Sequence, residues 1–173
     1  MRDLEARSET LGISTNELMN NAGFSIASHI AKNMGPLKGL KVVSLVGTGN
    51  NGSDCLIASG HLAKWGASVT AVILKPRSEP DLRRQETLEM GISLIDISEG
   101  KENCSFSSIH SLLRKAHIIV DGILGIGTSL PIRDPFKTVL SDIRALNEKK
   151  AKVFSIDVPS GVDSDTSAVD SSA

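Results

Sequence analysis

The chain has 173 residues, of which 40% are hydrophobic, and this is enough for a single domain with a substantial core. Nineteen basic and twenty acidic residues give a net charge of −1, and aromatic residues make up 3%. The sequence therefore has neither the basic surface nor the stacking side chains typical of nucleic-acid binding.

Cys55 and Cys104 are far apart and lack metal-type spacing, which favours reduced thiols. The N-terminal residues carry charges of both signs, unlike a signal peptide, and no apolar run is long enough to cross a bilayer. We expect a cytoplasmic protein with no nucleic-acid or membrane partner.

Hydrophobic periodicity predicts helices that alternate with strands. The capping box formed by Ser14 and Glu17 starts a long helix that Gly35 and Pro36 end, and a shorter helix is predicted over 2–9. Strands are predicted at 41–46, 69–74, 93–97, 117–121 and 152–156, helices at 54–64, 81–90, 109–114 and 135–147, and a surface loop at 99–108. Because the connections have helix length, the right-handed crossover rule gives a mostly parallel, Rossmann-like sheet covered on both faces. The predicted fold class is α/β, a three-layer αβα sandwich.

Three predicted strands end in polar, turn-forming sequence, at 47–54, 121–131 and 157–161. In a parallel sheet all three segments lie on the edge where ligands usually bind. The first runs Gly-Thr-Gly-Asn-Asn-Gly from Gly47 to Gly52 and leads into a helix. Its glycines allow close approach to the backbone, and the helix N-terminus favours an anion. This combination predicts binding of a nucleotide or its diphosphate.

The same glycines match the dinucleotide-binding fingerprint G-x-G-x-x-G, so a nicotinamide-dependent oxidoreductase is one interpretation. That fingerprint expects an Asp or Glu after the second strand to hold the ribose. Lys75, Pro76 and Arg77 stand there instead, and their cations suit a 2′-phosphate. The fingerprint also leaves the paired asparagines and the aspartates at two further strand ends unexplained.

The three segments resemble the NAD(P)H-hydrate epimerase family, also called the YjeF N-terminal domain. The resemblance is carried by GNNGSD at 49–54, VDGILGIG at 120–127 and IDVPSGVD at 156–163, supported by LMNNAG at 18–23, and it spans about residues 4–165. It implies an enzyme that interconverts the C6 epimers of hydrated NADH or NADPH. A partner dehydratase then restores these damaged cofactors from only one epimer.

The resemblance also implies which residues form the site. Potassium would be held by Asn51, Asp121 and Ser160. Asp157 would contact the substrate, and we assign it as the general acid/base. The remaining substrate-binding residues implied by the resemblance are Asn50, Asn51, Gly52, Ser53 and Asp54 in the first segment, and Gly125, Ile126, Gly127, Thr128, Ser129, Leu130 and Pro131 in the second.

General chemistry is consistent with these functional roles and also with purely structural roles for the same residues. Asp121 lies at the end of a buried strand, so the cost of desolvating its carboxylate must be offset. A cation would do this, and so would a backbone or arginine partner. Oxygen ligands with one carboxylate suit a weakly charged hard cation. Epimerisation at C6, by loss of water or by ring opening, needs proton transfer, and a strand-tip carboxylate in a partly dry pocket has its pKa raised towards neutrality. The simpler role for Asp157 is to cap a helix or brace a loop.

The family continues with further strands beyond the stretch at 163–166, so we expect residues 1–173 to be a single YjeF N-terminal-type domain truncated at its C-terminus. It could be the front of a bifunctional epimerase and dehydratase, and relatives often form homodimers. Two other functions remain open. One is an NAD(P)-binding oxidoreductase domain, and the other is a non-catalytic scaffold or protein-binding module, which would be expected to lose Asp121 and Asp157.

Overall fold

The computed structural model describes residues 12–98, 105–146 and 151–173. The helix predicted over 2–9 and Cys104 lie outside the described residues. Within them, none of the helices is both long and apolar enough to cross a membrane.

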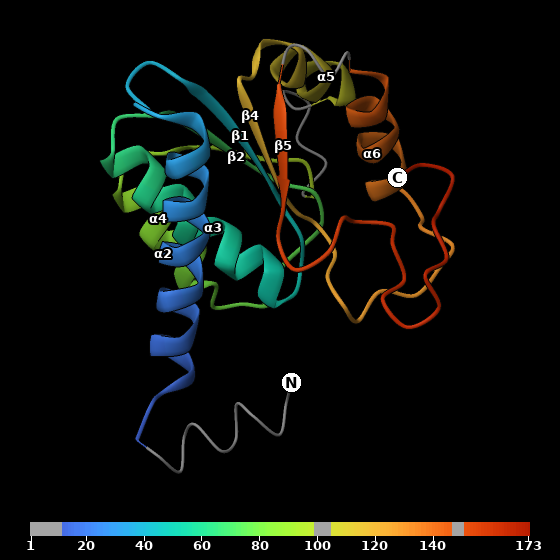
Figure 1. The fold of residues 1–173 in the computed structure, drawn as a ribbon, viewed down its shortest axis with the longest axis horizontal. Coiled ribbons are helices and arrows are strands. Elements are labelled where there is room, and N and C mark those ends of the chain that lie inside the picture. Colours follow the sequence, from blue (N-terminus) through green and yellow to red (C-terminus); the bar gives the residue numbers. More distant parts are fainter. Residues whose placement is uncertain (1–11, 99–104, 147–150) are drawn as a thin grey trace.

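A parallel sheet forms the middle layer (Figure 1). Its described strands are β1 (Lys41–Val46), β2 (Ser68–Ile73), β3 (Ser93–Asp96), β4 (Ile118–Gly122) and β5 (Lys152–Ser155). They lie in the order β3-β2-β1-β4-β5, and each neighbouring pair is parallel. The chain moves outward from β1 to β3 and then returns to β4, so the strand order reverses between β1 and β4. The expected ligand crevice therefore lies beyond the carboxyl ends of these two strands.

Helices cover both faces of the sheet, which confirms the predicted three-layer αβα fold (Figure 1). The helices α2 (Thr15–Met34), α3 (Asn50–Lys64) and α4 (Leu82–Glu89) lie on one face, and α5 (Phe106–Lys115) and α6 (Phe136–Ala145) lie on the other. The predicted capping box is present at the start of α2, where the Ser14 side chain accepts from the Glu17 amide at 3.2 Å and the Glu17 carboxylate accepts from the Ser14 amide at 3.0 Å.

The central strand β1 is apolar on both sides. Val42 and Val46 pack under α2 and α3, whereas Val43 and Leu45 pack towards α5 and α6. This period-two alternation follows from strand geometry, and burial of each such side chain contributes about 1.5–3 kcal/mol. The result is a rigid strand that fixes the position of the glycine-rich turn at its end.

Two predicted helix boundaries were wrong. The helix expected from 54 begins at Asn50, because Gly49 adopts an extended backbone, with φ −96° and ψ −162°, and serves as the N-cap. The helix expected from 109 begins at Phe106, with Ser105 as its N-cap, so the end of the predicted loop at 99–108 is helical and residues 99–104 lie outside the described part. The other predicted elements differ from the observed ones by at most two residues at either end.

Candidate functional site

The glycine-rich turn after β1 packs against the turn after β4. The Gly47 amide donates to the Gly122 carbonyl at 3.0 Å, and a Cβ added to Gly47 would collide with the main-chain oxygen of Ile123. A Cβ on Gly52 would collide with the main-chain oxygen of Gly47. These glycines are therefore required by close backbone approach, and two of the three polar segments predicted to converge do meet.

Asn51 lies in the first turn of α3, not in a loop as predicted, and it is 8% exposed. Its side-chain Nδ2 donates to the carbonyl oxygens of Leu124 and Ile156, each at 3.1 Å. Gly125 packs so closely on this carboxamide that a Cβ there would overlap it. One buried side chain thus joins the ends of β1, β4 and β5.

Asp121 is 3% exposed and is surrounded by hydrogen-bond donors. Its Oδ1 accepts from the Ser160 hydroxyl at 2.6 Å and from the Ile123 amide at 3.3 Å. Its Oδ2 accepts from the Ser160 amide at 2.9 Å and from the Ser155 hydroxyl at 3.1 Å. These four hydrogen bonds offset the cost of removing the Asp121 carboxylate from water. The buried carboxylate therefore needs no arginine partner.

Ser160 completes the cluster at 2% exposure. Its Oγ accepts from the Leu124 amide at 2.9 Å and lies 3.3 Å from the Leu124 carbonyl oxygen. The three residues predicted to hold potassium, Asn51, Asp121 and Ser160, are thus brought together around Leu124. We refer to them as the oxygen cluster.

The oxygen cluster fits a monovalent cation by its chemistry. Its atoms are carboxylate, hydroxyl, amide and main-chain carbonyl oxygens, which are hard ligands with a single full charge. Among residues 12–98, 105–146 and 151–173 there is no group of three or more His, Cys, Asp or Glu side chains that could hold a metal. Asn51, Asp121 and Ser160 include no His or Cys side chain, the ligands that transition metals usually take.

Asp157 follows β5 and is exposed, so the described residues do not give it the partly dry pocket that we expected. Its backbone has φ 60°, and the Val158 amide donates to the Ile156 carbonyl at 2.8 Å across it. This pattern matches a three-residue γ-turn, which is rare and strained for a residue with a side chain. The turn lies at the same sheet edge as the oxygen cluster, because Asp157 directly follows β5.

The second glycine-rich segment, at 125–131, is partly open. Ile126, Gly127, Ser129 and Pro131 are exposed, whereas Thr128 folds back so that its hydroxyl donates to the Gly125 carbonyl at 2.6 Å. The segment is held at its end by the Ile132 amide, which donates to the Asp170 carboxylate at 2.9 Å. Its predicted contact with substrate phosphate stays a prediction.

Arg77 is a site-supporting residue whose role the sequence did not reveal. Its side chain is 7% exposed, and Nε pairs with the Asp81 carboxylate at 2.6 Å. One terminal nitrogen donates to the Ser53 hydroxyl at 2.9 Å and the other to the Gly47 carbonyl. The cation is therefore committed to the first glycine-rich turn and is not presented to a 2′-phosphate. The signal in the sequence was the spacing of Arg77 and Asp81 by four residues across a helix start.

Cys55 packs beside β1 as a core residue, with Sγ 3.7 Å from the Leu45 carbonyl oxygen. Burial, with the Asp121 charge as the next cause, raises the pKa of the thiol to about 12. Cys55 is therefore a neutral thiol and supplies no nucleophile.

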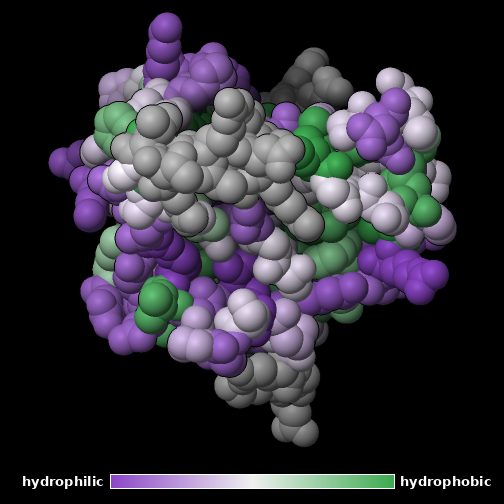
Figure 2. Space-filling view, turned by 90° about the horizontal axis from the view of Figure 1, so that it is seen from below, coloured by the Kyte–Doolittle hydropathy of each residue, from purple (hydrophilic) through white to green (hydrophobic). Residues whose placement is uncertain are grey.

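The strands in Figure 1 run downward, so these segments gather at its lower edge. Figure 2 shows the molecule from below, and hydrophilic residues make up much of the coloured surface there. The three polar segments predicted to meet do share this edge.

Comparison with known proteins places these features in context. The family described as YjeF-related protein N-terminus matches residues 15–173. A protein named NAD(P)H-hydrate epimerase from Nitrosopumilus maritimus is 31% identical over 96% of this chain and 74% of its own length. Another of that name from Schizosaccharomyces pombe is 34% identical over 85% of this chain and 58% of its own.

Two further similarities concern chain length and fold. A protein named bifunctional NAD(P)H-hydrate repair enzyme, from Hyperthermus butylicus, is 35% identical over 94% of this chain, which spans 29% of that protein. The crystal structure of the yeast protein ynu0 superposes with a TM-score of 0.73 at 25% identity, covering 95% of this chain and 71% of that one.

Proposed function

This chain belongs to the family of YjeF-related protein N-termini, and we propose that it interconverts the C6 epimers of hydrated NADH and NADPH. The observation that carries the proposal is the meeting of Asn51, Asp121 and Ser160 at the edge where Asp157 and the first glycine-rich turn also lie. Relatives named NAD(P)H-hydrate epimerase, matched over most of this chain, support the same activity.

The first glycine-rich turn and the start of α3 suit the diphosphate of the substrate. Main-chain amides at a helix N-terminus and its positive dipole end favour an anion. Asn50 and Ser53 lie in the first turn of α3, and Arg77 holds the Ser53 hydroxyl through a hydrogen bond of 2.9 Å. We assign substrate binding to residues 50–54 and 125–131.

Asp157 is the residue that we propose to move the proton. The C6 carbon carries a hydroxyl group beside the ring nitrogen, so it loses its configuration either when that hydroxyl leaves as water or when the ring opens. Loss of water needs a proton delivered to the hydroxyl oxygen as the C–O bond breaks, and a proton removed when water adds back. Ring opening needs the hydroxyl proton removed as the C–N bond breaks and a proton delivered to the ring nitrogen, and ring closure reverses both transfers. An exposed carboxylate held in a fixed turn can serve both steps once substrate covers it.

The oxygen cluster is where potassium would be held, by Asn51, Asp121 and Ser160. When bound, the ion would supply positive charge near the diphosphate. The chain's own residues set the geometry: Asp121 orients Ser160 through two hydrogen bonds, and Asn51 holds the ends of β4 and β5 in register.

A dehydratase acting on the same hydrated cofactors is the proposed functional partner, whether separate or fused. This proposal draws on the relative that is named a bifunctional repair enzyme. A homodimer and a cytoplasmic location stay predictions.

The test is to mix the purified protein with hydrated NADH of one C6 configuration and follow the epimer ratio by chromatography. We expect approach to the equilibrium ratio much faster than in buffer. An oxidoreductase would instead bind intact cofactor and transfer hydride to a second substrate. A ratio that changes no faster than in buffer, with folded protein, would rule out the epimerase.

A further inference from the structure

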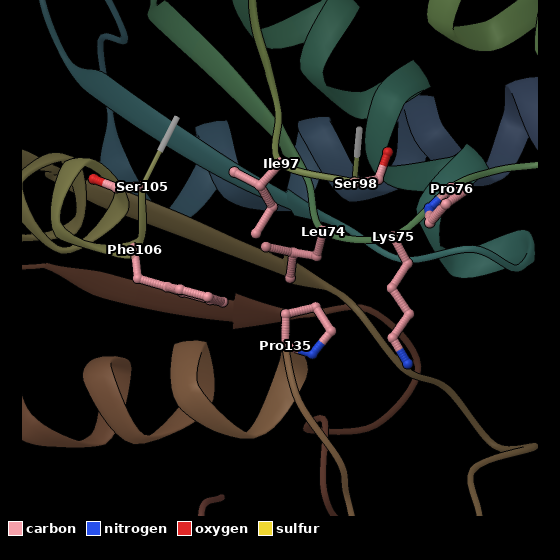
Figure 3. Close-up of a pocket in the computed structure, with 8 residues that line it drawn as sticks. All are labelled: Leu74, Lys75, Pro76, Ile97, Ser98, Ser105, Phe106 and Pro135. Atoms are coloured by element: carbon pink, nitrogen blue, oxygen red, sulfur yellow. The ribbon is translucent and has the colours of Figure 1, made fainter. Parts of the chain in front are cut away.

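A slot opens at the carboxyl ends of β2 and β3, beside the first glycine-rich turn and apart from the oxygen cluster (Figure 3). It has a volume of about 420 Å³, within the range of roughly 300–1,000 Å³ usual for small-molecule sites. We refer to it as the β2/β3 slot. None of the proposed substrate-binding residues lines it.

The walls of the slot are largely apolar. Leu74 and Ile97 form one side, and the rings of Phe106 and Pro135 stand across from them (Figure 3). Phe106 is 42% exposed although it sits at the start of α5, so its ring is available for a partner. Such a lining favours a planar heterocycle that can stack.

Polar groups stand at the rim of the slot. Lys75 and Ser98 line it beside Pro76, and the Lys75 ammonium lies 4.6 Å from the centre of the Phe136 ring. A few polar groups around an apolar slot are what fixes the orientation of a bound ring. The described residues of the lining include a lysine and two serines, and none of these described residues is acidic.

The separation between the β2/β3 slot and Asp157 follows from the strand order. Leu74 follows β2, whose last residue, Ile73, is paired with Val46 directly before the first glycine-rich turn. Asp157 follows β5, which is two strands from β1 on the other side. With neighbouring strands about 4.8 Å apart, the slot and Asp157 are separated by three to four spacings, roughly 14–19 Å.

A dinucleotide has this shape. Its two rings are separated by two riboses and a diphosphate, so a hydrated nicotinamide near Asp157 and a diphosphate at the α3 N-terminus would direct the other base towards β2 and β3. We infer that the β2/β3 slot binds the adenine ring of the hydrated cofactor, stacked on Phe106. This inference rests on the proposed function, which assigns no binding site to the adenine ring of the substrate.

The test uses AMP, which carries the adenine and one phosphate but no reacting ring. Saturation-transfer NMR on the wild type should show strong transfer to the adenine protons H2 and H8, and calorimetry should give a dissociation constant. We expect Phe106→Ala to weaken AMP binding about tenfold, Phe106→Tyr to restore it, and ribose 5-phosphate to bind equally to all three forms. Phe24→Ala, which removes an exposed aromatic ring on α2, is the matched control and should leave AMP binding unchanged.

Other outcomes would overturn either the adenine assignment or the proposed function. No AMP binding at millimolar concentration, or binding that Phe106→Ala leaves unchanged, would overturn the adenine assignment. Epimerisation is measured separately. If hydrated NADH is epimerised with a KM that Phe106→Ala does not change, the slot is wrong and the function stands. If AMP binds through Phe106 but no epimerisation occurs, the slot stands and the proposed function fails.

Discussion

The hydroxyl of Ser160 donates to Oδ1 of Asp121 at 2.6 Å, and the two residues are 39 positions apart in the chain. The Ser160 amide donates to the other carboxylate oxygen at 2.9 Å. One carboxylate therefore holds the segment after β5 against the end of β4. Because both residues are buried, this contact ties the stability of the fold to the geometry of the site.

Asp121→Asn should destabilise the protein. The carboxylate accepts four hydrogen bonds, whereas an asparagine offers one acceptor oxygen and places its NH₂ against donors such as the Ser160 amide. Buried donors that lose a charged partner cost about 1–3 kcal/mol. We expect urea denaturation to show a loss of about 2–3 kcal/mol. Asp165→Asn, at an exposed aspartate, is the matched control, and equal stability of the two variants would refute this role for Asp121.

Potassium should stabilise the folded protein if the oxygen cluster binds it. Above its dissociation constant, each tenfold rise in potassium should add about 1.4 kcal/mol to the free energy of unfolding. The measurement is thermal unfolding in potassium chloride against tetramethylammonium chloride at equal ionic strength. Ser160→Ala should abolish the difference between the two salts. Identical curves in both salts for the wild type would exclude a potassium site.

Sequence reasoning succeeded where the physics is periodic or local. Short apolar runs bounded by turn-forming residues located every described strand, and the pairing of Ser14 with Glu17 marked the start of α2. Parallel strands then brought Asn51, Asp121 and Ser160 to one edge. Each of these conclusions follows from geometry that repeats along the chain.

Features set by tertiary contact could not be predicted in this way. Arg77 looked like a free cation, but its partners Gly47, Ser53 and Asp81 are known only when β1, α3 and α4 are assembled. Asp157 looked like a residue of a dry pocket, yet it is exposed at a strained turn. The hydrogen bonds from Arg77 to Gly47 and Ser53 and the backbone conformation of Asp157 depend on contacts between segments far apart in the chain.

Arg77→Met should destabilise the protein by about 3–5 kcal/mol, because it leaves the buried Asp81 carboxylate without its cation. The double variant Arg77→Met with Asp81→Leu removes both charges and should recover much of that loss, as a double-mutant cycle by urea denaturation would show. Arg84→Met removes an arginine that is more exposed and whose ion pair is longer, at 3.6 Å, and is the matched control. Additive effects of the two substitutions would contradict a coupled pair.

Asp170 should make stability depend on acid pH. Hydrogen bonds from the Ser172 hydroxyl and amide, followed by that from the Ile132 amide, lower its pKa from 3.8 to about 2. A carboxyl group with a lowered folded-state pKa stabilises the protein fully above its unfolded value, and this contribution is lost as the pH falls from about 4 to about 2. Thermal unfolding across that range should show a smaller decline for Asp170→Asn than for the wild type. A decline of equal size in both would remove Asp170 as a cause.

Asp157→Asn should slow epimerisation strongly while leaving the fold intact. Asparagine tolerates the positive φ of this turn better than alanine does, so the variant removes the proton-transferring carboxylate without adding backbone strain. General acid/base catalysis typically contributes 10²–10⁴-fold, so kcat should fall by about that factor while KM changes little. Asp157→Ala should lose both activity and some stability, and comparison of the two separates chemistry from strain. Ser167→Asn, at the other non-glycine residue with φ 60° in the described chain, is a control for substitution at such a backbone and should retain full activity. Undiminished kcat in Asp157→Asn would assign the proton transfer to another group.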